Sequence, residues 1–395
     1  MTPHEALDEA GARRDWRVFT VLVFCFSFGF AVYNGIFHNF FREVMHGGPE
    51  QLGILESLRE TPGLLTALLA GTLVALAEAR LAGVALGLCA VGMAATGLAP
   101  SYWALVGLSV LWSTGFHLWS SVQAAITLSL ARHQEGGRHL GRMAGVGALA
   151  VLTALLFTRA VKPFASYEAL FALSGAMIMV ASWLAFRLSD RASGVERRPI
   201  VFRRRYGLYY GLTFLEGCRR QVFGTFASFV LIAVYGADVT TMLNLALLNA
   251  AVSAVCVPMI GRMVDRLGER RMLTVYYVAI VGVFWGYATT RDVSMLYALF
   301  ALDNLLFGFG VAITTYLNRI ADKAELTPSL AMGTTMNHVA AVLVPVTGGM
   351  LWSLTGDYRI PFAIGIGVAL VSLAATQFIP RAAPPATASP ESASR

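Results

Sequence analysis

The sequence predicts an all-α membrane protein of twelve transmembrane helices, arranged as two six-helix bundles. Of its 395 residues, 56% are hydrophobic and only 13% are charged, whereas a soluble domain carries about 25% charged residues. Long apolar runs follow one another along the whole chain, and each is long enough to cross a hydrocarbon core of roughly 30 Å as a helix. They lack the short alternating pattern of a membrane β-barrel.

Twelve such runs are bounded by charged or turn residues. They lie at 16–41, 52–77, 81–99, 102–131, 141–161, 167–187, 206–234, 240–261, 272–290, 294–318, 328–354 and 359–379. The longest connection, 188–205, divides them six and six, which predicts bundles at 16–187 and 206–379. We expect residues 1–15 to be a cytoplasmic segment and the Ala/Pro/Ser-rich residues 380–395 to be a disordered tail.

The basic residues predict the orientation of the chain. Lys and Arg number 30, and 22 of them fall in the connections on one side, together with the two termini, against 5 on the other side. Cytoplasmic connections are enriched in Lys and Arg, so we expect both termini in the cytoplasm and the protein in a bacterial-type plasma (inner) membrane. The basic linker 188–205 is then a solvated segment that faces lipid headgroups, and the net charge of +7 indicates topology, not nucleic-acid binding.

A charged stretch, Glu216-Gly-Cys-Arg-Arg220, interrupts the seventh run near its middle. Arg219 and Arg220 follow Glu216 at i+3 and i+4, so we expect the three side chains to share one helix face. On insertion scales, each charge costs roughly 2.5–3.5 kcal/mol at the bilayer centre. This indicates a polar cavity for an ion or polar solute; the alternative is a structural ion pair between helices.

Residues 261–273, with the sequence GRMVDRLGERRML, resemble the cytoplasmic-loop signature of the major facilitator superfamily. Residues 71–75 form a weaker copy about 190 residues earlier, and this half-chain repeat is typical of a pseudo-symmetric transporter. Gly261 would allow close helix approach, and Gly268 would permit a tight turn. The resemblance implies a latch that favours one access state, made of Gly261, Asp265, Arg266, Gly268, Arg270 and Arg271.

The resemblance also implies that spans one, four, seven and ten line a central cavity, while spans three, six, nine and twelve face lipid. The ionisable residues fit this arrangement, because the interiors of the four lipid-facing spans carry no acid, base or histidine. The expected cavity residues are Glu216, Arg219, Arg220, Asp303, Asn304, His117, Asn337 and His338. The second span repeats the Glu-x-x-Arg spacing nearer the outer surface, and the expected outer gate or ion pair there consists of Glu56, Arg59, Glu60 and His38.

These residues predict a secondary active transporter that moves a small polar or charged solute by alternating access. Arg219 and Arg220 are expected to bind an anionic group, because guanidinium groups match carboxylate and phosphate. Glu216, Asp303 or His338 would carry protons. A cationic or zwitterionic solute on the two carboxylates is compatible with the same charges, and the direction of transport stays open. We expect a monomer in the lipid bilayer, with protons and a small-molecule solute as its partners and no cofactor.

Two other functions are alternatives: a Cu(I)-type metal carrier and a non-transporting membrane sensor. Met332, Met336 and His338 offer thioether and imidazole groups that suit Cu(I), although methionines at helical spacing are more often packing residues. A non-transporting membrane sensor would leave the buried charges without a purpose. The sequence contains no HExxH, GxSxG or Walker motif, so an enzyme or an ATP-driven pump is not expected.

Overall fold

The computed structural model describes residues 3–69, 78–131, 136–189 and 202–381. Within these ranges the chain is helical and contains no strand. The helices are α1 (Pro3–Glu43), α2 (Pro49–Leu69), α3 (Glu78–Ala95), α4 (Tyr102–Leu130), α5 (Gly136–Val161), α6 (Tyr167–Ala185), α7 (Gly207–Ala233), α8 (Val239–Leu267), α9 (Glu269–Thr289), α10 (Val293–Leu306), α11 (Val311–Ile320), α12 (Lys323–Thr355) and α13 (Arg359–Thr376).

The predicted tenth span is formed by two helices, α10 and α11. For this reason the described ranges contain thirteen helices although twelve spans were predicted. A 3₁₀ turn at Phe307–Gly310 separates α10 from α11. This turn has the sequence FGFG, and each glycine disfavours a helix interior by about 1 kcal/mol relative to alanine. A short 3₁₀ stretch inside a helix often marks a functional hinge, and this one lies beside the cavities described below.

Nine helical segments of the described chain are long and apolar enough to cross a membrane. The three predicted spans that fall outside this group are α2, α4 and α7. They are less apolar because they carry many of the predicted polar site residues, among them Glu56, His117 and Glu216. The chain is therefore a multi-pass membrane protein whose polar groups are concentrated on a few helices.

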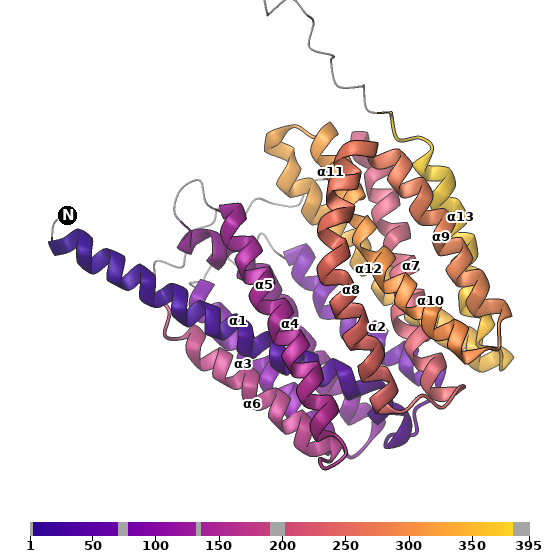
Figure 1. The fold of residues 1–395 in the computed structure, drawn as a ribbon, viewed down its shortest axis with the longest axis horizontal. Helices are drawn as coiled ribbons and strands as arrows, with labels where there is room; N and C mark the ends of the chain where they lie inside the picture. Colours follow the sequence, from indigo (N-terminus) through magenta and orange to yellow (C-terminus); the bar gives the residue numbers. More distant parts are fainter. Residues whose placement is uncertain (1–2, 70–77, 132–135, 190–201, 382–395) are drawn as a thin grey trace, which may run out of the picture.

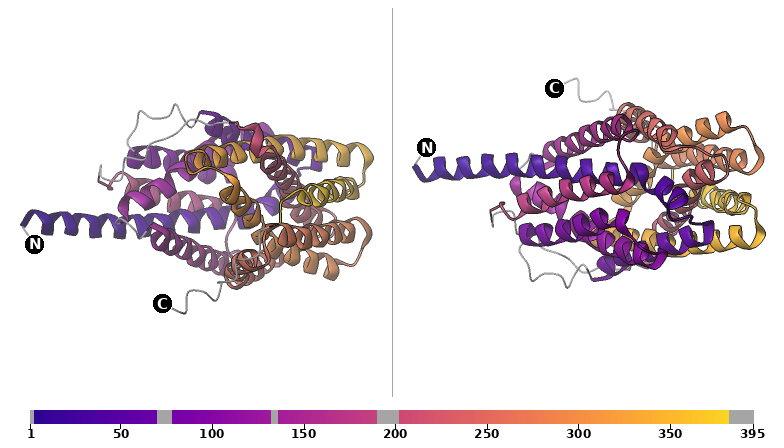
Figure 2. Two further views of the ribbon diagram at one scale, coloured as in Figure 1. Left: turned by 90° about the horizontal axis from the view of Figure 1, so that it is seen from above. Right: turned by 90° about the horizontal axis from the view of Figure 1, so that it is seen from below.

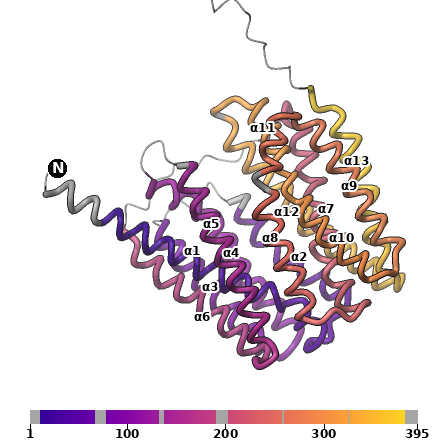
Figure 3. The backbone as a smooth tube through the Cα atoms, viewed as in Figure 1, coloured from indigo at the N-terminus to yellow at the C-terminus, as the bar shows by residue number. Residues whose placement is uncertain are grey.

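The helices form two bundles, α1–α6 and α7–α13, which lie side by side (Figure 1). In the first bundle, α3 packs on α4 and α6; in the second, α13 packs on α9. The bundles meet where α2 packs on α12 and where α5 packs on α8. The views from above and below show the two groups of helices meeting along their length (Figure 2), and the backbone tube shows α5 and α8 beside each other (Figure 3).

The bundles touch most closely near the start of α2 and the end of α12. A Cβ atom added at Gly53 would collide with the backbone of Pro345, and one added at Gly349 would collide with the backbone of Pro49. Nearby, the Val346 amide donates a hydrogen bond to Ser57 Oγ at 3.0 Å. Glycine therefore allows the main chains of the two halves to meet directly at the predicted outer end.

The ends of the bundles differ from expectation in one respect. Residues 3–15, predicted as a separate segment, belong to the continuous 41-residue helix α1, because Ala, Leu, Glu and Arg are strong helix formers. The predicted linker and tail lie largely outside the described residues, as does the weaker signature copy at 71–75. At the described end of the linker, Arg205 donates hydrogen bonds to Glu325 and Asp322, and these bonds raise the pKa of Arg205 above its ordinary value.

Candidate functional site

A buried charge network lies inside the second bundle. Arg219 of α7 is 1% exposed, and its Nη1 donates a hydrogen bond to Asp303 Oδ2 of α10 at 3.3 Å. Its Nε lies 3.9 Å from Glu216 Oε1. Glu216 accepts hydrogen bonds from the Tyr276 hydroxyl at 2.8 and 2.9 Å and from the Tyr277 hydroxyl at 3.4 Å. One guanidinium group is thus shared by two carboxylates, one of which is also held by two phenols.

The two tyrosines were missed by sequence reasoning, because the ninth span was expected to face lipid. The expectation is only half right: Val275 and Val278 of α9 are exposed, whereas Tyr276 and Tyr277 are fully buried. One face of α9 therefore contacts Glu216 and another faces outward. Two adjacent tyrosines in the interior of an apolar helix were the available signal, since buried tyrosine hydroxyls usually find a hydrogen-bond partner.

Arg220 points differently from Arg219. It is exposed, and its guanidinium carbon lies 4.3 Å from the centre of the Phe307 ring in the 3₁₀ turn. Arg220 and Glu216 line a cavity of about 410 Å³ together with Tyr209, Thr213 and Asn337; we call this the Arg220 cavity. Successive helical residues are about 100° apart, so the expected single face of three charges is divided between a buried network and a cavity wall.

A second cavity, of about 300 Å³, brings together residues predicted in two separate groups. We call it the central charged cavity. It lies between the bundles, and its polar lining includes Asn34, His38, Glu56, Arg59, Arg219, Arg220, Asp303 and Asn304. Glu56 and Arg59 form an ion pair on α2. Three residues assigned to an outer gate therefore line the same cavity as the charges of α7 and α10.

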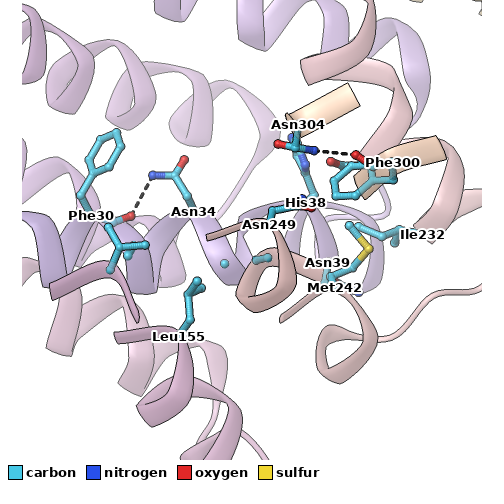
Figure 4. A pocket seen from close by; sticks show the side chains of 15 residues that line it. Phe30, Asn34, His38, Asn39, Leu155, Ile232, Met242, Asn249, Phe300 and Asn304 are labelled. Atoms are coloured by element: carbon cyan, nitrogen blue, oxygen red, sulfur yellow. Dashed lines mark hydrogen bonds between the residues drawn. The ribbon is translucent and has the colours of Figure 1, made fainter. Parts of the chain in front are cut away.

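A third cavity, of about 370 Å³, is mainly apolar and carries amide groups on its wall. Asn34, Asn39, Asn249 and Asn304 line it together with His38 (Figure 4). The side-chain amides of Asn34 and Asn304 donate to backbone carbonyls of their own helices at 2.8 and 2.9 Å, which uses one of the two N–H donors of each NH₂ group. Asn34, His38 and Asn304 also line the central charged cavity, so the two cavities adjoin.

Glu60 contacts Arg59 of the expected outer gate and also lies against two histidines that were expected in the cavity. Its Oε2 is 3.3 Å from His338 Nδ1 and 3.9 Å from His117 Nε2. The two imidazole rings meet edge to face, with centroids 4.9 Å apart. Met332 and Met336 pack against the hydrophobic core, as methionines at this spacing commonly do. His338, the third residue of the Cu(I) alternative, therefore lies with Glu60 and His117.

The predicted latch contains one confirmed element and one correction. Gly268 ends α8 and precedes α9 with φ of +79°, a left-handed backbone that glycine adopts without strain, so the expected tight turn is present. A Cβ atom added at Gly261 would meet nothing within 4 Å. The expected close helix approach at Gly261 is therefore wrong for this conformation.

The charged residues of the latch lie at the surface. Asp265, Arg266 and Arg271 are exposed, while Arg270 Nε and Nη2 donate to Gln377 Oε1 at 3.3 and 3.2 Å. The Arg270 contact joins the start of α9 to the end of α13.

Comparison with known proteins gives a family match and a fold match. Residues 209–395 match the sequence profile of the Major Facilitator Superfamily. The fold resembles the nucleoside transporter NupG, with a TM-score of 0.75, 12% identity and coverage of 92% of this chain and 98% of that one. A search of curated protein sequences gives no match.

Two further solved structures have the same fold. A bacterial homologue of the human lysosomal transporter Spinster, in an inward-facing conformation, has a TM-score of 0.71 and 12% identity, with coverage of 93% of this chain and 97% of that one. A D-xylose-proton symporter has a TM-score of 0.70 and 14% identity, with coverage of 92% and 97%. At these identities the likeness establishes the fold over nearly the whole chain.

Proposed function

We propose that this chain is a secondary active transporter, because residues 209–395 match the sequence profile of the Major Facilitator Superfamily and the fold resembles that of solved transporters over nearly the whole chain. It would move a small polar or charged solute by alternating access across the plasma membrane, with both termini in the cytoplasm. The observation that carries the proposal is the central charged cavity, which takes charges from both bundles. Ionisable groups inside a membrane protein commonly mark solute or ion pathways.

An anionic solute is favoured by the state of the cavity arginines. Arg219 is paired with Asp303 and Arg59 with Glu56, so both are already compensated. Arg220 lies instead over the Phe307 ring and faces two cavities. A carboxylate or phosphate could bind Arg220 through a forked pair of hydrogen bonds, which a ring face does not offer.

The rest of the Arg220 cavity suits the polar body of a small organic anion. Thr213, Thr334 and Asn337 supply hydroxyl and amide groups on its wall. Its volume of about 410 Å³ falls within the range of about 300–1,000 Å³ that is usual for small-molecule sites. We therefore infer a metabolite-sized anion that carries hydroxyl or amide groups in addition to its charge.

Glu216 links this solute site to protons. Its carboxylate lines the Arg220 cavity, so an anion bound to Arg220 would approach a like charge. Protonation of Glu216 would remove the repulsion. Solute binding and protonation would then favour each other, which is the thermodynamic requirement for proton–solute symport.

A two-step experiment tests the proposal. Purified protein is screened by thermal unfolding against mono- and dicarboxylates, sugar phosphates and nucleotides, with amines and amino acids as the contrasting set. The stabilising compound is then measured for uptake into proteoliposomes, with and without an imposed proton gradient. Stabilisation by cations alone would contradict the anion assignment. An anion that binds without any flux would contradict transport and favour a sensor.

A further inference from the structure

The Glu60–His117–His338 cluster has no part in the transport mechanism proposed above. It joins three helices from both bundles: Glu60 lies on α2, His117 on α4 and His338 on α12. Each residue offers one ligand atom, and these atoms lie within 4.8 Å of one another. We propose that the cluster is a binding site for a divalent first-row transition-metal ion, for which Zn²⁺ is the representative probe.

The donor set favours this class of ion. Two imidazoles and one carboxylate are borderline ligands that suit Zn²⁺ and Fe²⁺, whereas Ca²⁺ and Mg²⁺ prefer oxygen alone and Cu(I) prefers sulfur. With metal–ligand distances of roughly 2.1 Å, tetrahedral donors lie about 3.4 Å apart. The His338–Glu60 pair is already at 3.3 Å and the His117–Glu60 pair at 3.9 Å. Small rotations of the two rings would complete the geometry.

The surroundings of the cluster leave room for its rings and hold the carboxylate. Gly63, one helical turn after Glu60, lies against both imidazoles: an added Cβ would stand 2.5 Å from His338 Cε1 and 2.6 Å from His117 Cε1. Arg59 Nη2 lies 3.8 Å from Glu60 Oε1, which leaves Oε2 directed at the histidines. Glycine at position 63 is therefore the residue that lets both rings approach the carboxylate.

The cluster is sheltered, and one of its nitrogens is held only by a loose contact with Glu60. The side chains of Glu60, His117 and His338 are 16%, 9% and 15% exposed, so they are sheltered yet reachable by a small ion. Nδ1 of His338 is buried and makes no hydrogen bond within the described chain. Its contact is the 3.3 Å approach to Glu60 Oε2, and coordination to a metal ion would satisfy both of these atoms.

A bound ion would connect the two halves of the protein. Glu60 and His117 belong to the first bundle and His338 to the second, so the three ligands stay together only while α2 and α4 keep their present position against α12. An ion that binds this conformation more tightly than another shifts the population toward it. The site would therefore act as a metal-dependent brake on the relative movement of the bundles.

Direct metal binding tests the site without any need for a transported solute. Full-length protein, freed of its affinity tag and stripped with chelator, is titrated with Co²⁺ while its visible absorption is recorded, and Zn²⁺ is then added as a competitor. We expect one ion per chain and displacement of Co²⁺ by Zn²⁺. Glu60→Gln, His117→Gln and His338→Gln should each weaken the affinity by at least about tenfold, since even outer-shell changes cost that much.

The matched control is His139→Gln, which changes a histidine of α5 that stacks on Trp16 of α1 and is not a member of the cluster. It should bind metal as the unmodified protein does. Zn²⁺ should also raise the unfolding temperature of the unmodified protein and of the control, but not of His338→Gln. The proposal is overturned if no ion binds, or if the three cluster variants bind as tightly as the control. Neither result bears on solute transport.

Discussion

Arg219 and Asp303 form the buried ion pair that joins α7 to α10, with Nη1 of the arginine 3.3 Å from Oδ2 of the aspartate. The pair is asymmetric, because Arg219 also faces Glu216 at 3.9 Å, and Glu216 is held by Tyr276 and Tyr277. Removal of the arginine therefore leaves two carboxylates without their cation, whereas removal of the aspartate leaves the arginine with one carboxylate.

The first prediction follows from this asymmetry. Arg219→Ala should lower the free energy of unfolding by roughly 3–5 kcal/mol, because it leaves buried charges uncompensated. Asp303→Ala should lower it by less. The double variant Arg219→Ala/Asp303→Ala should recover part of the loss, since Glu216 keeps its tyrosine partners. Thermal unfolding in detergent gives the four values of the cycle. Strictly additive losses would show that the two residues do not interact.

A second prediction concerns Arg220. Arg220→Ala should leave the unfolding temperature almost unchanged, because this side chain is exposed and pairs with a ring. It should remove the binding of an anionic solute. Arg17→Ala, which changes an exposed arginine on α1, is the matched control and should keep that binding. If Arg220→Ala binds the solute as the control does, the anion site lies elsewhere.

Proton coupling gives a third prediction. In proteoliposomes, Glu216→Gln should still exchange or transport solute but should no longer move protons with it, because the neutral amide mimics the protonated carboxyl. Asp303→Asn should keep solute-driven proton movement if Glu216 alone carries the proton. A pH-sensitive dye inside the vesicles reports the flux. Undiminished proton movement in both variants would exclude the two carboxylates as the proton carriers.

The fourth prediction concerns the turn between α8 and α9. Asp265→Asn should fold normally and keep its solute affinity, because Asp265 is exposed. It should slow transport by changing the balance between access states. Asp357→Asn, at the opposite end of the second bundle, is a control that should transport normally. Equal rates for the two variants would mean that the signature serves topology alone.

Apolar runs were enough to predict the spans, because a helix must remain apolar over a length set by the bilayer. The turn at Gly268 was also predictable, since positive φ strongly favours glycine. The partners of the buried charges were not. Glu216 and Tyr276 are 60 residues apart, and nothing local to either residue indicates the other.

The sequence indicated which polar residues lie inside the membrane-spanning helices, but it did not indicate which of them lie next to each other. Depth along a helix placed Glu60 near an outer gate, yet the rotation of α2 brings it to His117 and His338. Rotation depends on the packing of neighbouring helices, which a single helix does not encode. The same reason explains why Gly261, predicted to lie against another helix, faces open space.

The direct meeting of main chains at Gly53 and Gly349 has a consequence for how this protein tolerates change. Where side chains separate two helices, a substitution can be absorbed by a new rotamer, but here the obstacle would be backbone on both sides. A single methyl group at either position would act as a wedge between the bundles. Gly53→Ala should therefore fold within each half and yet favour the conformation that is open at this end, which a cysteine-accessibility assay would detect.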